Sequence, residues 1–209
     1  MHSPYPPDVE RLNVFTHSLG IFYGVLTTIW ILPKARIAGE DALIGSMVFL
    51  AGFILTFSTS TLYHAIKDVQ LKWLMRRADH ICIFFMIAGS YTPFILLYYK
   101  NKTGLTLLTI MWVLTLLGTV FKAFATGKYP NLSITIYVLM GAAILWISQS
   151  FFPLLPLQVT SLILAGGLSY LIGVFFYRKK SWKYSHPIWH LFVLGGALSH
   201  WWALWYALG

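Results

Sequence analysis

The chain has 209 residues, of which 58% are hydrophobic and 10% are charged, whereas soluble domains carry roughly 25% charged residues. This composition excludes an ordinary soluble domain, and the single cysteine, Cys82, excludes an intrachain disulfide and a cysteine-rich metal site. The net charge of +9 comes from basic residues between apolar runs. That pattern favours orientation in a membrane and contact with anionic lipid over nucleic-acid binding.

The first residues are predicted to stay outside the membrane. Residues 1–9 include three prolines, and we expect this tail not to start a helix early, so that residues 1–13 form a short cytoplasmic segment. The apolar run that follows has membrane-spanning length, and Pro33-Lys34-Ala35-Arg36 stands after it in place of a small-residue cleavage site. The run is therefore predicted to be a transmembrane helix and not a signal peptide.

Seven apolar runs of membrane-spanning length follow one another along the chain. They predict helices at residues 14–32, 42–65, 79–99, 105–123, 133–151, 157–177 and 187–208. The connecting segments are short, so helices that are adjacent in sequence are expected to be adjacent in space. The predicted fold is all-α, a polytopic seven-transmembrane-helix bundle that forms a single domain over residues 1–209.

The basic residues predict the orientation of this bundle. Of the 15 lysines and arginines, 11 lie in the N-terminal segment and the even-numbered loops, and 4 lie in the odd-numbered loops. Because loops rich in Lys and Arg stay in the cytoplasm, the N-terminus is predicted to be cytoplasmic and the C-terminus to lie outside.

Several ionisable residues are predicted to gather at the cytoplasmic side. His64 ends the second predicted helix, Asp79 begins the third, and His186 and His190 stand at the start of the seventh. Residues four apart share one face of a helix, so Ser60 faces the same way as His64, and His186 the same way as His190. Ionisable groups that point into a membrane bundle are costly and usually functional.

A second set of polar residues enters the membrane at the same side. Glu10, Asn13 and His17 are spaced to share one helix face at the start of the first span. His200 differs, because it follows His190 by ten residues and so lies about 15 Å further across the membrane. We expect His200 to make a helix–helix hydrogen bond and not to join the site.

Three imidazoles, two of them from an i, i+4 pair, are a ligand set that zinc accepts with a fourth position left for water. His64, His186 and His190 are the predicted ligands. Asp79 is predicted to orient the water or take its proton, and Ser60 to hydrogen-bond the water or a substrate oxygen. Zinc is favoured, while iron and manganese remain alternatives.

Each residue also has an ordinary interpretation. His186 can cap its helix, and Asp79 can pair with Arg76 or Arg77 or stabilise the start of its helix. Ser60 can be a small packing residue, Glu10 and Asn13 can be helix-start residues, and Cys82 is expected in the core. The coincidence of so many ionisable groups at one depth favours the metal site over these separate interpretations.

The motifs resemble those of a known family. Glu10-x-x-Asn13-x-x-x-His17, Ser60-x-x-x-His64, Asp79 in Arg-Ala-Asp-His-Ile, Gly89-Ser-Tyr-Thr-Pro-Phe94 and His186-x-x-x-His190 resemble the bacterial haemolysin III proteins of the progestin and adipoQ receptor family, which is related to alkaline ceramidases. The resemblance covers nearly the whole chain. It implies seven helices, a cytoplasmic N-terminus and zinc held by His64, His186 and His190, with Asp79 and Ser60 around the water.

The resulting expectation is a multi-pass protein of the bacterial inner membrane that hydrolyses a lipid amide or ester with zinc in membrane lipid homeostasis. Its expected partners are membrane lipids, as fatty acyl substrate or product, and not nucleic acid. One alternative is a non-catalytic sensor of the membrane state with structural zinc. The other is a cytolytic protein.

Overall fold

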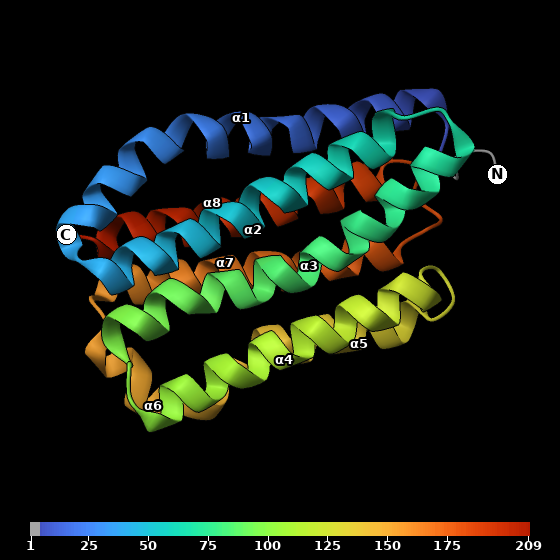
Figure 1. The fold of residues 1–209 in the computed structure, drawn as a ribbon. Helices are drawn as coiled ribbons and strands as arrows, with labels where there is room; N and C mark the ends of the chain where they lie inside the picture. Colours follow the sequence, from blue (N-terminus) through green and yellow to red (C-terminus); the bar gives the residue numbers. More distant parts are fainter. Residues whose placement is uncertain (1–4) are drawn as a thin grey trace.

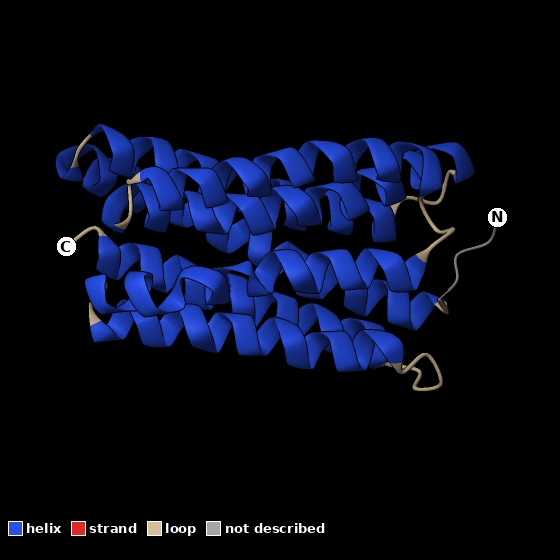
Figure 2. Cartoon of the chain, turned by 90° about the horizontal axis from the view of Figure 1, so that it is seen from below, coloured by secondary structure: helices blue, strands red, loops and turns tan. Residues whose placement is uncertain are grey.

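The computed structural model describes residues 5–209, and within that range it contains helices and no strand (Figure 2). Two short 3-10 helices, η1 (Ala143–Ile147) and η2 (Phe152–Leu154), flank α6. The α-helices are α1 (Pro7–Ala38), α2 (Glu40–Ala65), α3 (Val69–Tyr98), α4 (Lys102–Ala125), α5 (Pro130–Ala142), α6 (Ser148–Phe151), α7 (Leu157–Arg178) and α8 (Ser185–Ala207).

Six of the described segments are long and apolar enough to cross a membrane, namely α1, α2, α3, α4, the segment Pro130–Leu154 and α7. The protein is therefore an all-α, multi-pass membrane protein, as the composition predicts. The seventh predicted span forms α8, which is long but is not among the six. Its three histidines and four tryptophans lower its hydropathy.

The long helices lie side by side with their ends at two levels (Figures 1 and 2). Helix α1 packs against α2 and α8, α2 packs against α3, α3 packs against α4, and α7 packs against α8. Helix α1 begins at the end of the bundle opposite to the C-terminus (Figure 1). The contact between α1 and α8 therefore brings the start of the chain beside the start of the last helix.

The first helix begins earlier than predicted. Helix α1 starts at Pro7 and not near residue 14, because proline in the first turn has no N–H to lose and its φ suits a helix. Asp8 and Glu10 stand in that first turn, where negative charge is favourable. The expectation that the proline-rich tail delays the helix is wrong for this part of the tail, and its residues 1–4 lie outside the described residues.

Two loops are shorter than predicted. Gly39 alone separates α1 from α2, and its φ of 118° explains why glycine makes this turn. Helix α3 starts at Val69, ten residues before the predicted position 79, and the Asp68 side chain caps it by accepting a hydrogen bond from Leu71 N at 2.8 Å. The charged first turns of α3 lie outside its apolar run, which is why hydropathy alone missed them.

The fifth predicted helix, 133–151, is interrupted. Helix α5 ends at Ala142, and η1, α6 and η2 continue the segment. The Tyr91 hydroxyl on α3 donates towards the carbonyls of Met140 and Gly141 at 2.8 and 2.9 Å and accepts from Ile144 N at 2.9 Å. An interrupted backbone inside a membrane protein needs such a partner, and a tyrosine on another helix supplies it.

Glycines allow α2 and α3 to approach closely. A Cβ at Gly45 would lie 2.6 Å from the Pro93 Cα, whereas a Cβ at Gly167 on α7 would meet nothing within 4 Å. We expect Gly45→Ala to lower the free energy of unfolding by about 1–3 kcal/mol through overpacking. Gly167→Ala is the matched control and should be neutral or slightly stabilising. Thermal unfolding in detergent measures both, and equal melting temperatures would contradict the close packing.

Candidate metal centre

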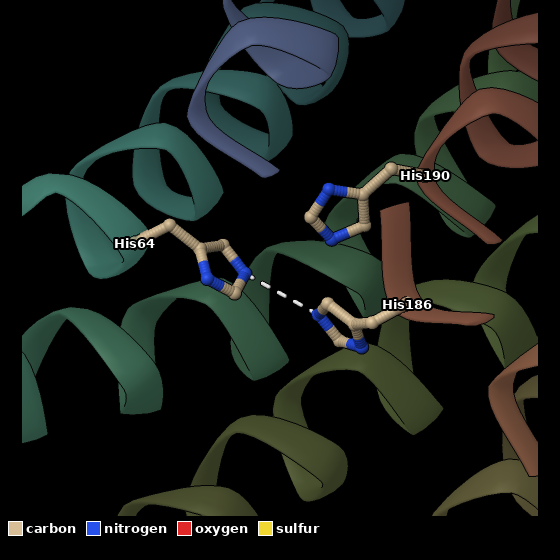
Figure 3. A group of neighbouring side chains, drawn as sticks. All are labelled: His64, His186 and His190. Atoms are coloured by element: carbon tan, nitrogen blue, oxygen red, sulfur yellow. Dashed lines mark hydrogen bonds between the residues drawn. The ribbon is translucent and has the colours of Figure 1, made fainter. Parts of the chain in front are cut away.

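Three histidines from two helices converge at one end of the bundle (Figure 3). His64 lies in the last turn of α2, and His186 and His190 lie in the first two turns of α8. One ligand atom from each ring lies within 4.8 Å of the others, and His64 Nε2 is 3.3 Å from His186 Nε2. The structure thus brings together the three residues that the sequence predicts as ligands.

The opposite ring nitrogen, Nδ1, has a partner in each of the three histidines. All of these partners come from the start of the chain. They are Glu10 Oε2 for His64 at 2.5 Å, Tyr5 Oη for His186 at 2.9 Å and Thr16 Oγ1 for His190 at 3.2 Å. Groups of this kind orient histidine ligands in metal sites and fix which nitrogen faces the metal.

The hydrogen-bond network assigns the tautomers of two rings. The Glu10 carboxylate can only accept, so His64 Nδ1 carries the proton. Thr16 donates its own proton to the carbonyl of Leu12 at 2.9 Å, so its oxygen accepts from His190 Nδ1. In both neutral imidazoles Nε2 then keeps its lone pair. His190 Nε2 is buried and has no hydrogen-bond partner among the described residues.

His186 completes a donor set that fits a zinc ion. With a lone pair on His64 Nε2, the metal-free network needs a proton on His186 Nε2, and Tyr5 then donates to His186 Nδ1. If a cation replaces that proton, the lone pairs of all three Nε2 atoms can bind it. Three imidazole nitrogens are a common zinc ligand set. The positioned nitrogens and the unpartnered Nε2 of His190 therefore fit the metal that the sequence motifs predict.

Asp79 and Ser60 lie beside this cluster. Ser60 is 1% exposed and Asp79 is 9% exposed. Asp79 lies close to Ser60 and interacts electrostatically with His64 and Arg76. The alternative ion pairs with Arg76 and Arg77 do not form, since none of the ion pairs between described residues includes Asp79. Asp79 therefore has no ion-pair partner among the described residues and lies within electrostatic reach of His64.

Glu10 and Asn13 belong to the same network and are more than helix-start residues. Asn13 Nδ2 lies 3.3 Å from Glu10 Oε2 and 3.3 Å from His64 Nδ1. The other Glu10 oxygen accepts from Lys72 Nζ at 3.0 Å. Lys72 also donates to the Tyr63 carbonyl at 2.8 Å, which ties the starts of α1 and α3 to the end of α2.

His17 lies against the cluster without being one of its three ligands. Its ring centroid is 3.7 Å from that of His190, and its side chain is buried. Neither ring nitrogen has a hydrogen-bond partner among the described residues. His17 therefore packs beside His190. His200 is separate, and its Nε2 lies 3.2 Å from the Ile163 carbonyl on α7, which confirms the predicted helix–helix hydrogen bond.

The interpretation of His186 as a helix cap is wrong. The cap residue of α8 is Tyr184, and no side chain makes a capping hydrogen bond there. His186 instead contacts Tyr5 and His64. Its ring stacks on that of Tyr5 at a centroid distance of 4.5 Å. Cys82 is buried, as expected for a core residue.

Sequence reasoning missed three residues of the site, namely Tyr5, Thr16 and Lys72. Burial raises the pKa of the Tyr5 phenol, so the hydroxyl keeps its proton beside His186. Of Tyr5, Thr16 and Lys72, only Thr16 had a signal in the sequence, because it stands beside the predicted site residue His17.

A second contact holds the start of α1 against the segment before α8. Lys183 Nζ lies 2.7 Å from Asp8 Oδ2, and this hydrogen bond raises the pKa of Lys183. Both groups are about half exposed, so the pair adds little stability.

Comparison with known proteins places the chain in a family. Hemolysin-3 of Bacillus cereus is 34% identical over 189 residues, which cover 90% of this chain and 86% of that protein. The Hemolysin-3 homolog of Bacillus subtilis (strain 168) is 34% identical over 189 residues, covering 90% and 89%. Monocyte to macrophage differentiation factor of Homo sapiens is 27% identical over 199 residues, covering 92% and 82%.

No solved structure matches this chain significantly. The family described as Haemolysin-III related matches residues 7–201, a range that contains Glu10, Asp79 and the three clustered histidines. This match agrees with the resemblance of the motifs. The chain therefore belongs to the haemolysin III-related family.

Proposed function

We propose that this protein is a zinc-dependent hydrolase of a lipid amide or ester that acts in membrane lipid homeostasis. One observation carries the proposal: three imidazoles, two of them buried, bring their ligand nitrogens together beside Ser60 and Asp79. A site that only strengthens the fold has no need of an acid at its edge. A hydrolytic site requires such a group to accept a proton.

The proposed roles follow from the positions of these side chains. His64, His186 and His190 would hold zinc, which when bound polarises an acyl carbonyl and acidifies a water molecule. Asp79 accepts the proton of the attacking water and returns it to the leaving amine or alcohol. Ser60, which lies close to Asp79, would hydrogen-bond the water or a substrate oxygen. Glu10, Tyr5 and Thr16 orient the three rings.

The proposed topology makes a lipid the natural substrate. We take α8 as a seventh span of a single domain, with the N-terminus in the cytoplasm of a bacterial cell and the protein in its inner membrane. The 11 to 4 distribution of basic residues supports this orientation. The outer faces of the helices near the site expose Leu12, Phe15 and Leu62, so an acyl chain can approach from the bilayer.

The test is release of fatty acid from a panel of ceramides and acyl lipids by protein in vesicles, measured by mass spectrometry. Wild type is expected to hydrolyse at least one member, and His190→Ala to lose roughly 10³-fold or more of that rate with the loss of the metal site. His200→Ala is the matched control, because it removes a partly buried histidine of α8 that lies outside the cluster. Equal rates for wild type and His190→Ala would overturn the proposal.

A second candidate function is cytolysis, which the name of the Bacillus cereus relative, Hemolysin-3, favours. The same vesicles loaded with a fluorescent dye distinguish it. Leakage that is equal for wild type and His190→Ala, without fatty acid release, would favour cytolysis. Retained metal with neither leakage nor hydrolysis would favour a membrane-state sensor.

A further inference from the structure

A second polar feature lies away from the histidines. A cavity of about 400 Å³ opens between the first turns of α3 and the end of α4, and we call it the α3–α4 pocket. Its polar and aromatic lining residues are Trp73, Arg76, Arg77, Phe124, Thr126 and Lys128. None of these residues belongs to the candidate metal centre.

The pocket is lined by three cationic side chains and by no carboxylate, and Asp79 interacts with Arg76 only at longer range. The described ion pairs include none of Arg76, Arg77 and Lys128. Arg77 Nε is buried and has no hydrogen-bond partner among the described residues. Arginine donors left unpaired in a buried position are costly. An anion that enters the pocket would give them a partner.

Another buried cation lies behind the pocket. Lys122 is 1% exposed and donates to Ser133 Oγ at 2.5 Å. It has no carboxylate partner within the described part of the chain. Thr126, which lines the pocket, donates its hydroxyl to the Lys122 carbonyl at 2.5 Å. Lys122 therefore adds to the positive potential at the pocket.

The guanidinium groups are held in place before any ligand binds. The Cζ atoms of Arg76 and Arg77 lie 5.5 and 5.3 Å from the centroid of the Trp73 ring, within the range of cation–π contacts. On the other side, a Cβ at Gly127 would lie 3.5 Å from Arg76 Nη2, and the φ of 81° at Gly127 forms the turn that passes there. The Trp73 ring thus lies beside both guanidinium groups, and the Gly127 turn lies beside that of Arg76.

We propose that the α3–α4 pocket binds the phosphate group of an anionic ligand, either a lipid headgroup or free phosphate. Planar guanidinium groups match phosphate oxygens in pairs, and basic pockets between membrane helices bind anionic headgroups. The pocket shares no lining residue with the proposed hydrolytic site, and its one link to that site is the electrostatic interaction of Arg76 with Asp79. His190→Ala should therefore bind the ligand as wild type does, so a failure of one proposal does not imply a failure of the other.

The experiment is calorimetric titration of the protein in neutral detergent with dioctanoyl phosphatidylglycerol, dioctanoyl phosphatidylcholine and inorganic phosphate. Lys128→Gln is expected to weaken phosphatidylglycerol binding about fivefold, and Arg77→Gln with Lys128→Gln roughly 25-fold. Lys67→Gln with Lys180→Gln is the matched control, because it removes the same charge from exposed positions outside the pocket. This control should bind as wild type does.

The arms separate the two sources and test the site. Binding of phosphatidylglycerol alone identifies a lipid headgroup, and binding of inorganic phosphate as well identifies the phosphate group itself. Equal weakening by both double variants, or equal binding of the zwitterionic phosphatidylcholine, would overturn the proposal. Since Lys128 lies on an exposed turn, Lys128→Gln should keep the fold even if Arg77→Gln does not. Unchanged binding by that single variant would also count against the pocket.

Discussion

Purified wild-type protein is expected to carry about one zinc ion per chain, and the His64→Ala, His186→Ala, His190→Ala triple variant to carry none. The physical reason is the arrangement of the Nε2 atoms. Two of them keep lone pairs in the assigned network, and the third gains one when a cation replaces the proton shared by His64 and His186. Elemental analysis of protein in detergent, after zinc is supplied and excess removed, measures the content.

A graded variant makes this test sharper than deletion alone. Glu10→Gln keeps all three ligands but replaces the carboxylate that accepts from His64 Nδ1. Loss of such an orienting group lowers zinc affinity roughly 10- to 100-fold, which competition with a chelator can measure. His200→Ala should leave the affinity unchanged. If the wild-type protein carries no zinc, the histidines are packing residues, and the proposed zinc-dependent hydrolysis is wrong.

The candidate centre was predictable because membranes impose strong length and charge rules. A membrane span takes about 20 residues, so the position of a residue along its span gives its depth in the membrane. Counting along the chain therefore places His64, Asp79 and His186 at the same side. The i, i+4 spacing then places Ser60 on the same helix face as His64, and His186 on the same face as His190. These rules need no knowledge of side-chain packing, which explains why the clustered histidines match the prediction.

Other features depend on contacts that no local pattern contains. Tyr5 reaches His186 across 181 positions of sequence, and the tail in which it stands has no periodic signal. The interruption after α5 depends on Tyr91 of α3, whose hydroxyl satisfies the freed backbone groups. Helix α3 begins before its apolar run because Asp68 caps turns that carry charge. Hydropathy marks where a helix can enter a membrane, and it does not mark where the helix begins.

Asp79→Asn is expected to keep the zinc of the wild type and to lower lipid hydrolysis by about 10²- to 10⁴-fold, the usual contribution of a general base. Asparagine has nearly the same size as aspartate, but it cannot accept a proton at neutral pH. Rate and metal content should be measured on the same preparation. Ser60→Ala, which removes a hydroxyl group beside Asp79, should lower the rate less, by about tenfold.

This pair of measurements separates catalysis from structural metal binding. If zinc only strengthened the fold, Asp79 would be a buried carboxyl beside a ligand, and Asp79→Asn would keep the metal and raise stability by removing a costly buried charge. Any effect of the protein on membrane lipid composition would then be the same in the variant. If Asp79 is the base, that effect disappears while the metal remains. Loss of metal in Asp79→Asn would contradict both assignments, because it would make Asp79 a ligand.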